Sequence, residues 1–256
     1  MKLKFFNQKK NFFKSSLFFN SFGIKSKLDR NYSETPKYNQ PTPEPLPDDV
    51  HDSPLNISDP PPNCSWLTLR SWNCVFPLLE GWSGAQSKTL ISSLSQQNLP
   101  VEKEFSYMFF KMNEKYMGAP PDIICNLNCY KIDHPCFITK NLHENIVKNN
   151  NVYIRESGIE ELSSSIVNSF TRSLMRNDIL PSHLQMGSDI WIHSQFMAND
   201  TLKLLYELTI EGKADTPNSI QELTQSSDLI RDNFLLLDNQ ENIIVHPRFP
   251  KKSISK

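Results

Sequence analysis

The stretch GIEELSSSIVNSFTRSLM, residues 158–175, determines the fold that we expect. Its apolar residues recur at spacings of three and four, which places them on one face of a helix: Ile159, Leu162, Ile166, Val167, Phe170 and Leu174. Ser157 and Glu160 have the S-x-x-E spacing of a capping box at a helix start. Pro181 follows the pattern and cannot continue a helix. This stretch therefore predicts an amphipathic helix that needs a partner surface.

A second helix is expected between Pro100, which suits a helix start, and Gly118, which suits the position after a helix end. The apolar residues between them again have helical spacing: Phe105, Met108, Phe109, Met112 and Tyr116. Ordinary packing against residues 158–175 is one interpretation of this stripe. The alternative is a methionine-containing surface that binds a partner, formed by Phe105, Met108, Phe109 and Met112.

The remaining segments predict a small sheet and further helices. Short β-like runs occur at residues 123–132, 136–139 and 152–155, whereas residues 182–211 indicate two helices. Thr216 before Pro217 predicts another helix start, and residues 233–249 predict a β-hairpin. We therefore expect an α+β fold that is mainly helical, with a small sheet and a C-terminal helix–hairpin segment.

The C-terminal order of elements resembles that of a winged helix, a nucleic-acid-binding module. The resemblance rests on residues 204–208, 220–223, 228–237 and 243–245. It implies that nucleic acid would be contacted by four cations, Arg231, Arg248, Lys251 and Lys252. A helix that binds phosphates carries several cations, but Arg231 stands between two aspartates in SSDLIRDNF. A winged fold that contacts proteins is therefore the alternative.

The N-terminal part of the chain differs from the rest in composition. The first 28 residues contain seven lysines, seven phenylalanines and no acidic residue, a composition typical of a mitochondrial presequence. We assign residues 1–30 to such a presequence, with a basic arm on a cytosolic or nuclear protein as the alternative. Nine of the 18 prolines lie in residues 36–62, which predicts a disordered Pro-rich linker over residues 31–63. Residues 64–256 then form one domain, which could be sub-divided near residues 181–256.

Composition excludes several classes of function. The formal net charge of −1 provides no general attraction for nucleic acid. Only 7 glycines occur, and no motif has the spacing of a phosphate-binding loop, so no nucleotide is expected. No apolar run is long enough to predict a membrane-spanning helix, so we expect a soluble protein.

One cysteine-rich segment offers metal ligands. In CNLNCYKIDHPC, the side chains of Cys125, Cys129, His134 and Cys136 are the donors that zinc prefers. Their spacing, C-x3-C-x4-H-x-C, differs from the C-x2-C-x4-H-x4-C of a zinc knuckle. We therefore expect no cofactor and buried, reduced cysteines, with a zinc site as the alternative.

The cysteine spacing also carries a resemblance. Cys64 and Cys74 enclose nine residues, and Cys125 and Cys136 enclose ten. This spacing resembles half of the twin C-x9-C pattern of small disulfide-bonded proteins of the mitochondrial intermembrane space. Pro135 interrupts the second pair, and the odd total of 5 cysteines favours reduced thiols. We expect the mitochondrial matrix, with the intermembrane space as the alternative.

No motif in the chain predicts a catalytic residue, since the histidines have no nucleophile or carboxylate at a recognised spacing. We expect a non-catalytic mitochondrial factor that supports organelle gene expression by binding protein or RNA, in association with the ribosome or another ribonucleoprotein. A respiratory-complex assembly factor is one alternative. A small matrix enzyme or zinc-stabilised protein built on Cys125, Cys129, His134 and Cys136 is the other.

Overall fold

The computed structural model describes residues 50–51, 57, 59–86, 101–111, 122–148, 152–176 and 188–245. In these residues twelve strands form two antiparallel sheets, accompanied by two α-helices and one 3-10 turn. The protein is therefore mainly β, and the predicted mainly helical fold is wrong. Neither α-helix of this part has the length and apolar composition needed to cross a lipid bilayer.

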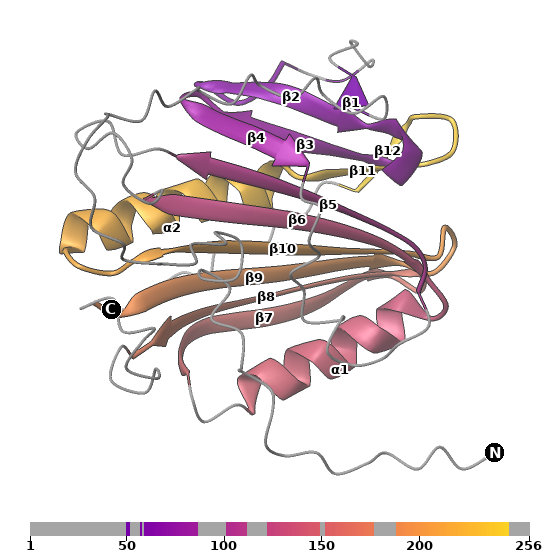
Figure 1. Ribbon diagram of the computed structural model, residues 1–256. Helices are drawn as coiled ribbons and strands as arrows, with labels where there is room; N and C mark the ends of the chain where they lie inside the picture. The colour runs from indigo at the N-terminus through magenta and orange to yellow at the C-terminus, as the bar shows by residue number, and fades with distance from the viewer. Residues whose placement is uncertain are drawn as a thin grey trace, which may run out of the picture.

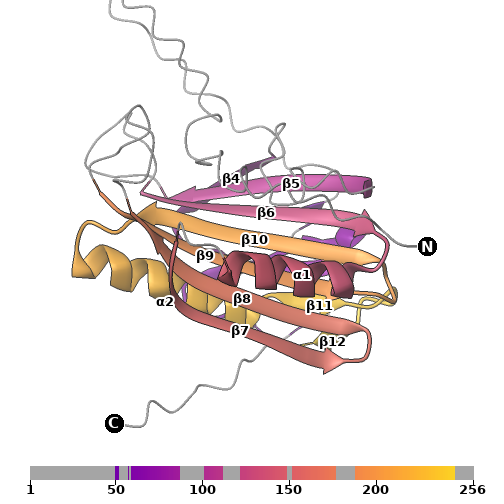
Figure 2. The same ribbon diagram turned by 90° about the horizontal axis from the view of Figure 1, so that it is seen from below.

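Seven strands form the large sheet, in the order β4-β5-β6-β10-β9-β8-β7. They are β4 (Trp82–Gln86), β5 (Val101–Lys111), β6 (Ile123–Ile132), β7 (Tyr153–Ser163), β8 (Ile166–Met175), β9 (Ile190–Asn199) and β10 (Leu204–Lys213). Strand β10 pairs with β6 on one side and with β9 on the other. Helix α1 (Pro135–Val147) covers one face of this sheet, where it packs mainly on β8 and β9 (Figure 2).

A small sheet and helix α2 (Pro217–Asn233) cover the opposite face of the large sheet (Figure 1). The small sheet has the order β1-β2-β3-β11-β12. Its strands are β1 (Val50–His51), β2 (Cys64–Leu69), β3 (Cys74–Leu79), β11 (Leu235–Leu237) and β12 (Ile243–Val245). The 3-10 turn η1 (Arg70–Trp72) joins β2 to β3. Because β3 pairs with β11, both ends of the described chain build this sheet.

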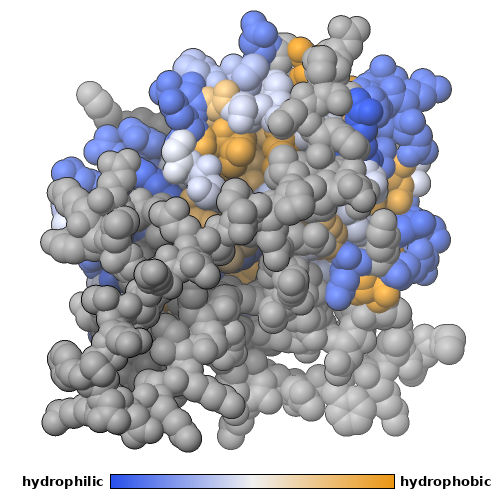
Figure 3. All heavy atoms as spheres, turned by 45° about the horizontal axis from the view of Figure 1, so that its top comes forward, coloured by the Kyte–Doolittle hydropathy of each residue, from blue (hydrophilic) through white to orange (hydrophobic). Residues whose placement is uncertain are grey.

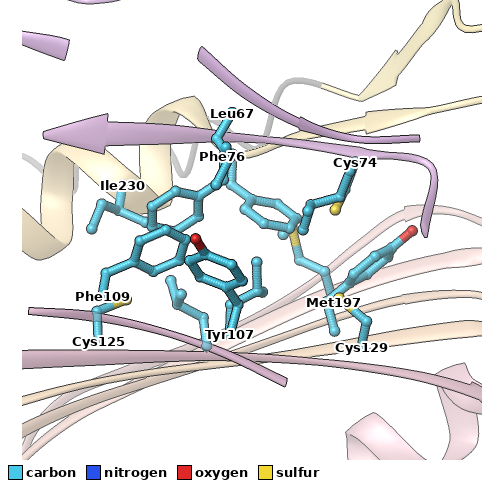
Figure 4. Packing of buried hydrophobic residues seen from close by; sticks show 14 of the residues in the cluster. Leu67, Cys74, Phe76, Tyr107, Phe109, Cys125, Cys129, Met197 and Ile230 are labelled. Atoms are coloured by element: carbon cyan, nitrogen blue, oxygen red, sulfur yellow. The ribbon is translucent and has the colours of Figure 1, made fainter. Parts of the chain in front are cut away.

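The main hydrophobic core lies between the two sheets (Figure 4). The rings of Phe76 on β3 and Phe109 on β5 stack in parallel, with centroids 4.3 Å apart. The hydroxyl of Tyr206 on β10 donates a hydrogen bond to the carbonyl oxygen of Trp72, at 2.6 Å. Ile230 of α2 belongs to the same cluster. Aromatic packing and one buried hydrogen bond therefore hold the small sheet on the large one.

The outer face of the small sheet carries a second, smaller apolar cluster. Val75, Leu235 and Leu237 form it, and the partly buried Ile57 and Trp66 pack against them. On the molecular surface that includes this face, apolar residues gather in a patch among hydrophilic ones (Figure 3).

The predicted helix over residues 158–175 is wrong, because these residues form the end of β7, a turn and strand β8. Ile166, Phe170 and Leu174 are four apart, a spacing that suits one face of a helix and one face of a strand. Ile166 packs in the core between the sheets, whereas the adjacent Val167 packs on the α1 side. Because β8 is buried on both faces, its apolar and polar side chains do not alternate, and the remaining four-residue spacing cannot be separated from that of a helix.

The same ambiguity explains two further errors. Residues 101–111 form β5 instead of a helix, and residues 182–211 contain β9 and most of β10 instead of two helices. The predicted strand at residues 136–139 belongs to the start of α1, in which Pro135 occupies an N-terminal position. These errors thus exchange helices and strands in both directions.

Elements with local turn or cap signals were predicted correctly. Residues 123–132 form β6, and residues 233–245 contain the β11–β12 hairpin. Helix α2 begins after Thr216, whose hydroxyl oxygen accepts a hydrogen bond from the Ser219 N–H at 3.1 Å. The winged-helix order is nevertheless absent, because residues 204–208 lie in strand β10 and the hairpin joins β3 in the small sheet.

Two predicted segments extend beyond the described residues. The predicted presequence, residues 1–30, lies entirely outside them. Within the predicted linker, residues 31–63, Val50 and His51 form strand β1 and pair with β2. The small sheet therefore begins before Cys64, where the folded part was expected to start.

Candidate functional site

The four predicted metal ligands lie on different sides of the large sheet. Cys125 and Cys129 of β6 are buried in the core between the sheets. His134 precedes α1 with a left-handed backbone conformation, and Cys136 is packed in the cluster on the α1 side. No group of three or more histidine, cysteine or acidic side chains in the described residues could hold a metal ion. The structure therefore does not bring the predicted zinc ligands together.

The electrostatic setting of these cysteines favours neutral thiols. Burial raises the pKa of Cys125 and of Cys129 well above its ordinary value. Burial and the neighbouring Asp200 carboxylate raise the pKa of Cys136 to about 11. The Cys136 thiol donates instead to the carbonyl oxygen of Ser165, at 3.3 Å. Because zinc binds the thiolate form, this environment opposes metal binding by any of the three cysteines.

The predicted partner-binding stripe is divided in the same way. Phe105 and Phe109 point from β5 into the core between the sheets, whereas Met108 is half-buried and Met112 lies outside the described residues. Two of the four side chains are therefore part of the interior and unavailable to a partner.

The predicted nucleic-acid contacts can be judged at one position. Arg231 lies in α2 with 8% of its surface exposed, and it forms ion pairs with Asp228 and Asp232, both at 2.9 Å. Its guanidinium also lies 5.1 Å from the centroid of the Phe170 ring. Arg231 thus fixes α2 on the sheet and is not presented to a phosphate backbone. The other three cations, Arg248, Lys251 and Lys252, lie outside the described residues.

An ionic cluster under α2, built around two buried arginines, was missed by the sequence analysis. Arg172 of β8 pairs with Glu156 of β7 at 2.8 Å and also contacts Asp228 of α2. His193 of β9 lies opposite Arg172 and is fully buried. Burial and the charges of Arg172 and Arg231 lower the pKa of His193 well below its ordinary value, so its ring is neutral. The cluster connects α2 to β7 and β8, and its acids already neutralise its two arginines.

A second polar network lies on the α1 side of the large sheet. Tyr130 donates a hydrogen bond to the Glu207 carboxylate at 3.1 Å, and Asn128 donates to the same oxygen at 3.3 Å. The Ser106 hydroxyl donates to Asn128 at 2.7 Å. Its members come from β5, β6 and β10, so only the strand order of the folded sheet brings them together. No sequence spacing could have identified it.

The outer edge of β7 is the candidate site for a partner. No described strand pairs with this edge, which ends the large sheet. Ile159, near the middle of β7, is 45% exposed, and Phe137 of α1 is 59% exposed. Lys140, one helical turn after Phe137, pairs with Glu161 of β7 at 2.6 Å, which brings this side of α1 to the edge. We call Phe137, Lys140, Ile159 and Glu161 the β7 edge surface.

Comparison of the chain with models of known protein families and with curated proteins found no match.

Proposed function

We propose that this protein is a non-catalytic mitochondrial factor that binds an extended segment of a protein partner on the β7 edge surface. The observation that carries the proposal is the long terminal strand β7, with exposed apolar side chains on and beside it. An unpaired strand edge offers a row of backbone N–H and C=O groups, to which an extended segment adds as a further strand.

The side chains of β7 favour a specific partner over unspecific association. Register shifts occur between Ile154 and Glu156 and between Glu161 and Ser163. Bulges and charges of this kind protect a sheet edge from random pairing. They leave Glu156–Glu161 as the regular part of the edge, with Ile159 as its exposed apolar residue. A partner segment with an apolar residue opposite Ile159, followed by side chains that contact Phe137, fits this surface.

The proposed location rests on the sequence. The proposed mode of binding rests on the fold, which does not support the winged-helix and enzyme hypotheses. The composition of residues 1–28 supports the mitochondrial location. The winged-helix argument for a role in gene expression fails with the fold, so we propose contact with a ribosome or another assembly only through protein. The enzyme alternative loses its basis, because Cys136 is separated from Cys125 and Cys129 by the large sheet.

The test uses Ile159→Lys in the full chain, because a charge at the centre of an edge opposes strand addition. Ile244→Lys on β12 is the matched control: Ile244 is a 38% exposed isoleucine, also on a terminal strand, in the small sheet. Each variant replaces the native protein in cells, and gently lysed mitochondria are sedimented on a sucrose gradient with and without ribonuclease. Both variants should keep the wild-type melting temperature, since substitutions on exposed surface change stability little.

The proposal predicts that wild type and Ile244→Lys sediment with heavy particles and that Ile159→Lys moves to light fractions. A shift of the wild-type protein after ribonuclease identifies the particle as a ribonucleoprotein, whereas resistance identifies a protein complex. Wild-type protein that runs as a free chain, or Ile159→Lys that stays on the heavy particle, overturns edge binding. Absence of the protein from mitochondria overturns the location.

A further inference from the structure

We propose that Cys74 and Cys129 form an intramolecular disulfide that joins the small sheet to the large sheet when the chain folds under oxidising conditions. The inference is independent of the β7 edge surface. It concerns a covalent modification in the core, and it rests on the way two neighbouring strands hold the Cys74 segment over Cys129.

The strands on either side of Cys129 both reach the segment that precedes Cys74. In the large sheet Cys129 stands directly opposite Phe105 on β5 and Tyr206 on β10. The Tyr206 hydroxyl donates to the carbonyl oxygen of Trp72 at 2.6 Å, and the Phe105 ring centroid lies 6.0 Å from that of Trp72. Trp72 is two residues before Cys74. These contacts therefore position the start of β3 above Cys129.

The two thiols meet in the core between the sheets. Both residues have no exposed surface, and both belong to the main hydrophobic cluster. Burial first, and the neighbouring Cys74 thiol after it, raise the pKa of Cys129 well above its ordinary value. Figure 4 shows Cys74 on the small-sheet side and Cys129 on the large-sheet side, at the same end of the core. Cys125, four residues earlier on the same strand, is also fully buried.

The disulfide would form before the core closes, with oxidised glutathione as the oxidant. The Cys129 thiolate attacks glutathione disulfide, which forms a mixed disulfide and releases one glutathione thiolate. The Cys74 thiolate then attacks the Cys129 sulfur and releases the second glutathione thiolate. The two cysteine protons pass to solvent, and one glutathione disulfide is reduced to two glutathione molecules. In the folded protein, burial makes both side chains inaccessible to redox reagents. The thiol or disulfide state that the two cysteines acquire during folding is therefore kept afterwards.

The experiment refolds the purified full chain in reduced glutathione alone or in a mixture of reduced and oxidised glutathione. Free thiols are alkylated, and peptide mass spectrometry then locates any disulfide. The variants are Cys74→Ala, Cys129→Ala and, as the matched control from the same strand, Cys125→Ala. Urea unfolding of reduced and oxidised wild type provides a second measurement that does not depend on any variant.

The expected result is one peptide pair that links Cys74 to Cys129 after oxidative refolding, in wild type and in Cys125→Ala. Neither Cys74→Ala nor Cys129→Ala should form it. Oxidised wild type should unfold at a higher urea concentration than reduced wild type, because the bond restricts the unfolded chain. Alkylation of both cysteines after oxidative refolding overturns the proposal, and so does a disulfide that uses Cys125 instead, a glutathione adduct without the internal bond, or an equal or lower urea midpoint.

Discussion

Substitution of Glu211 by glutamine should stabilise this protein above pH 5, and the gain should grow with pH. Glu211 lies on β10 with 3% of its surface exposed, and its Oε1 atom has no hydrogen-bond partner among the described residues. The strand register places it between Ile124 on β6 and Ile192 on β9. Loss of hydration in this apolar setting raises the pKa of Glu211 from 4.5 to about 8.

The sign of the pH dependence follows from this direction of shift. A carboxyl group whose pKa is higher in the folded state binds a proton more tightly there than in the unfolded chain. The folded state is therefore not penalised below about pH 4.5, and it loses stability as pH rises from 4.5 toward 8. The loss is about 1.4 kcal/mol per pH unit, so wild type should lose about 2.5 kcal/mol between pH 5 and pH 7 from this group.

The assay is urea unfolding of wild type and Glu211→Gln at pH 5 and pH 7, followed by tryptophan fluorescence. Glutamine has nearly the same shape and no proton to lose, so the free-energy difference between the two proteins should rise by about 2.5 kcal/mol from pH 5 to pH 7. Glu104→Gln on β5 is the control, because Glu104 is exposed. Its effect should stay the same at both pH values.

A free-energy difference for Glu211→Gln that does not change with pH would contradict the reasoning. It would mean that the carboxyl group has an ordinary pKa in the folded protein, and hence that β10 is hydrated at this position. A difference that falls with rising pH would require a cation beside Glu211.

Three further substitutions test, by urea unfolding, the packing of the two sheets and of α2 on the large sheet. Phe109→Ala removes the ring stacked on Phe76 and should cost about 3–5 kcal/mol; a loss below 1 kcal/mol would mean that the two rings do not pack in solution. Tyr206→Phe removes the hydroxyl that donates to the buried carbonyl of Trp72 and should cost about 1–3 kcal/mol, whereas an unchanged midpoint would argue against this hydrogen bond. Gly212→Ala places a methyl group 2.6 Å from a leucine of α2 and 3.0 Å from a backbone oxygen, so it should destabilise by about 1–3 kcal/mol, and a stabilised variant would show that α2 does not pack this closely on β10.

The parts of the fold that follow from local sequence signals were predictable. Thr216 and Pro217 mark the start of α2, and DNQEN, residues 238–242, marks the turn between β11 and β12. Strand β8 was not predictable in this way, because Ile166 and Phe170 keep the same side in a helix and in a strand. Only the existence of apolar cover on both faces decides between the two, and that cover comes from α1 on one side and from the core between the sheets on the other, whose residues lie elsewhere in the chain.

The candidate site was harder to predict than the fold. Ile159 was assigned to a buried helix face, but it is exposed because β7 ends the large sheet, and strand order is not encoded in any local pattern. Arg231 was considered for nucleic acid because it lies in SSDLIRDNF, within the segment that carries the winged-helix resemblance. The ion pair of Arg231 with Asp228, three residues earlier in α2, can be predicted from helical spacing. The contact of Asp228 with Arg172 joins two elements that are distant in the sequence and cannot be predicted in this way.

The small sheet has a consequence for the order of events in synthesis. Val75 on β3 pairs with Leu235 on β11, 160 residues further along the chain. Until β11 has left the ribosome, strand β3 lacks this neighbour, and the small sheet cannot fully cover the stacked aromatic residues. Contacts of such long separation slow folding and leave apolar surface exposed for longer. A nascent chain that stops before residue 235 should therefore be held by chaperones and cut readily by proteases, and resistance should arise in one step when the last strands emerge.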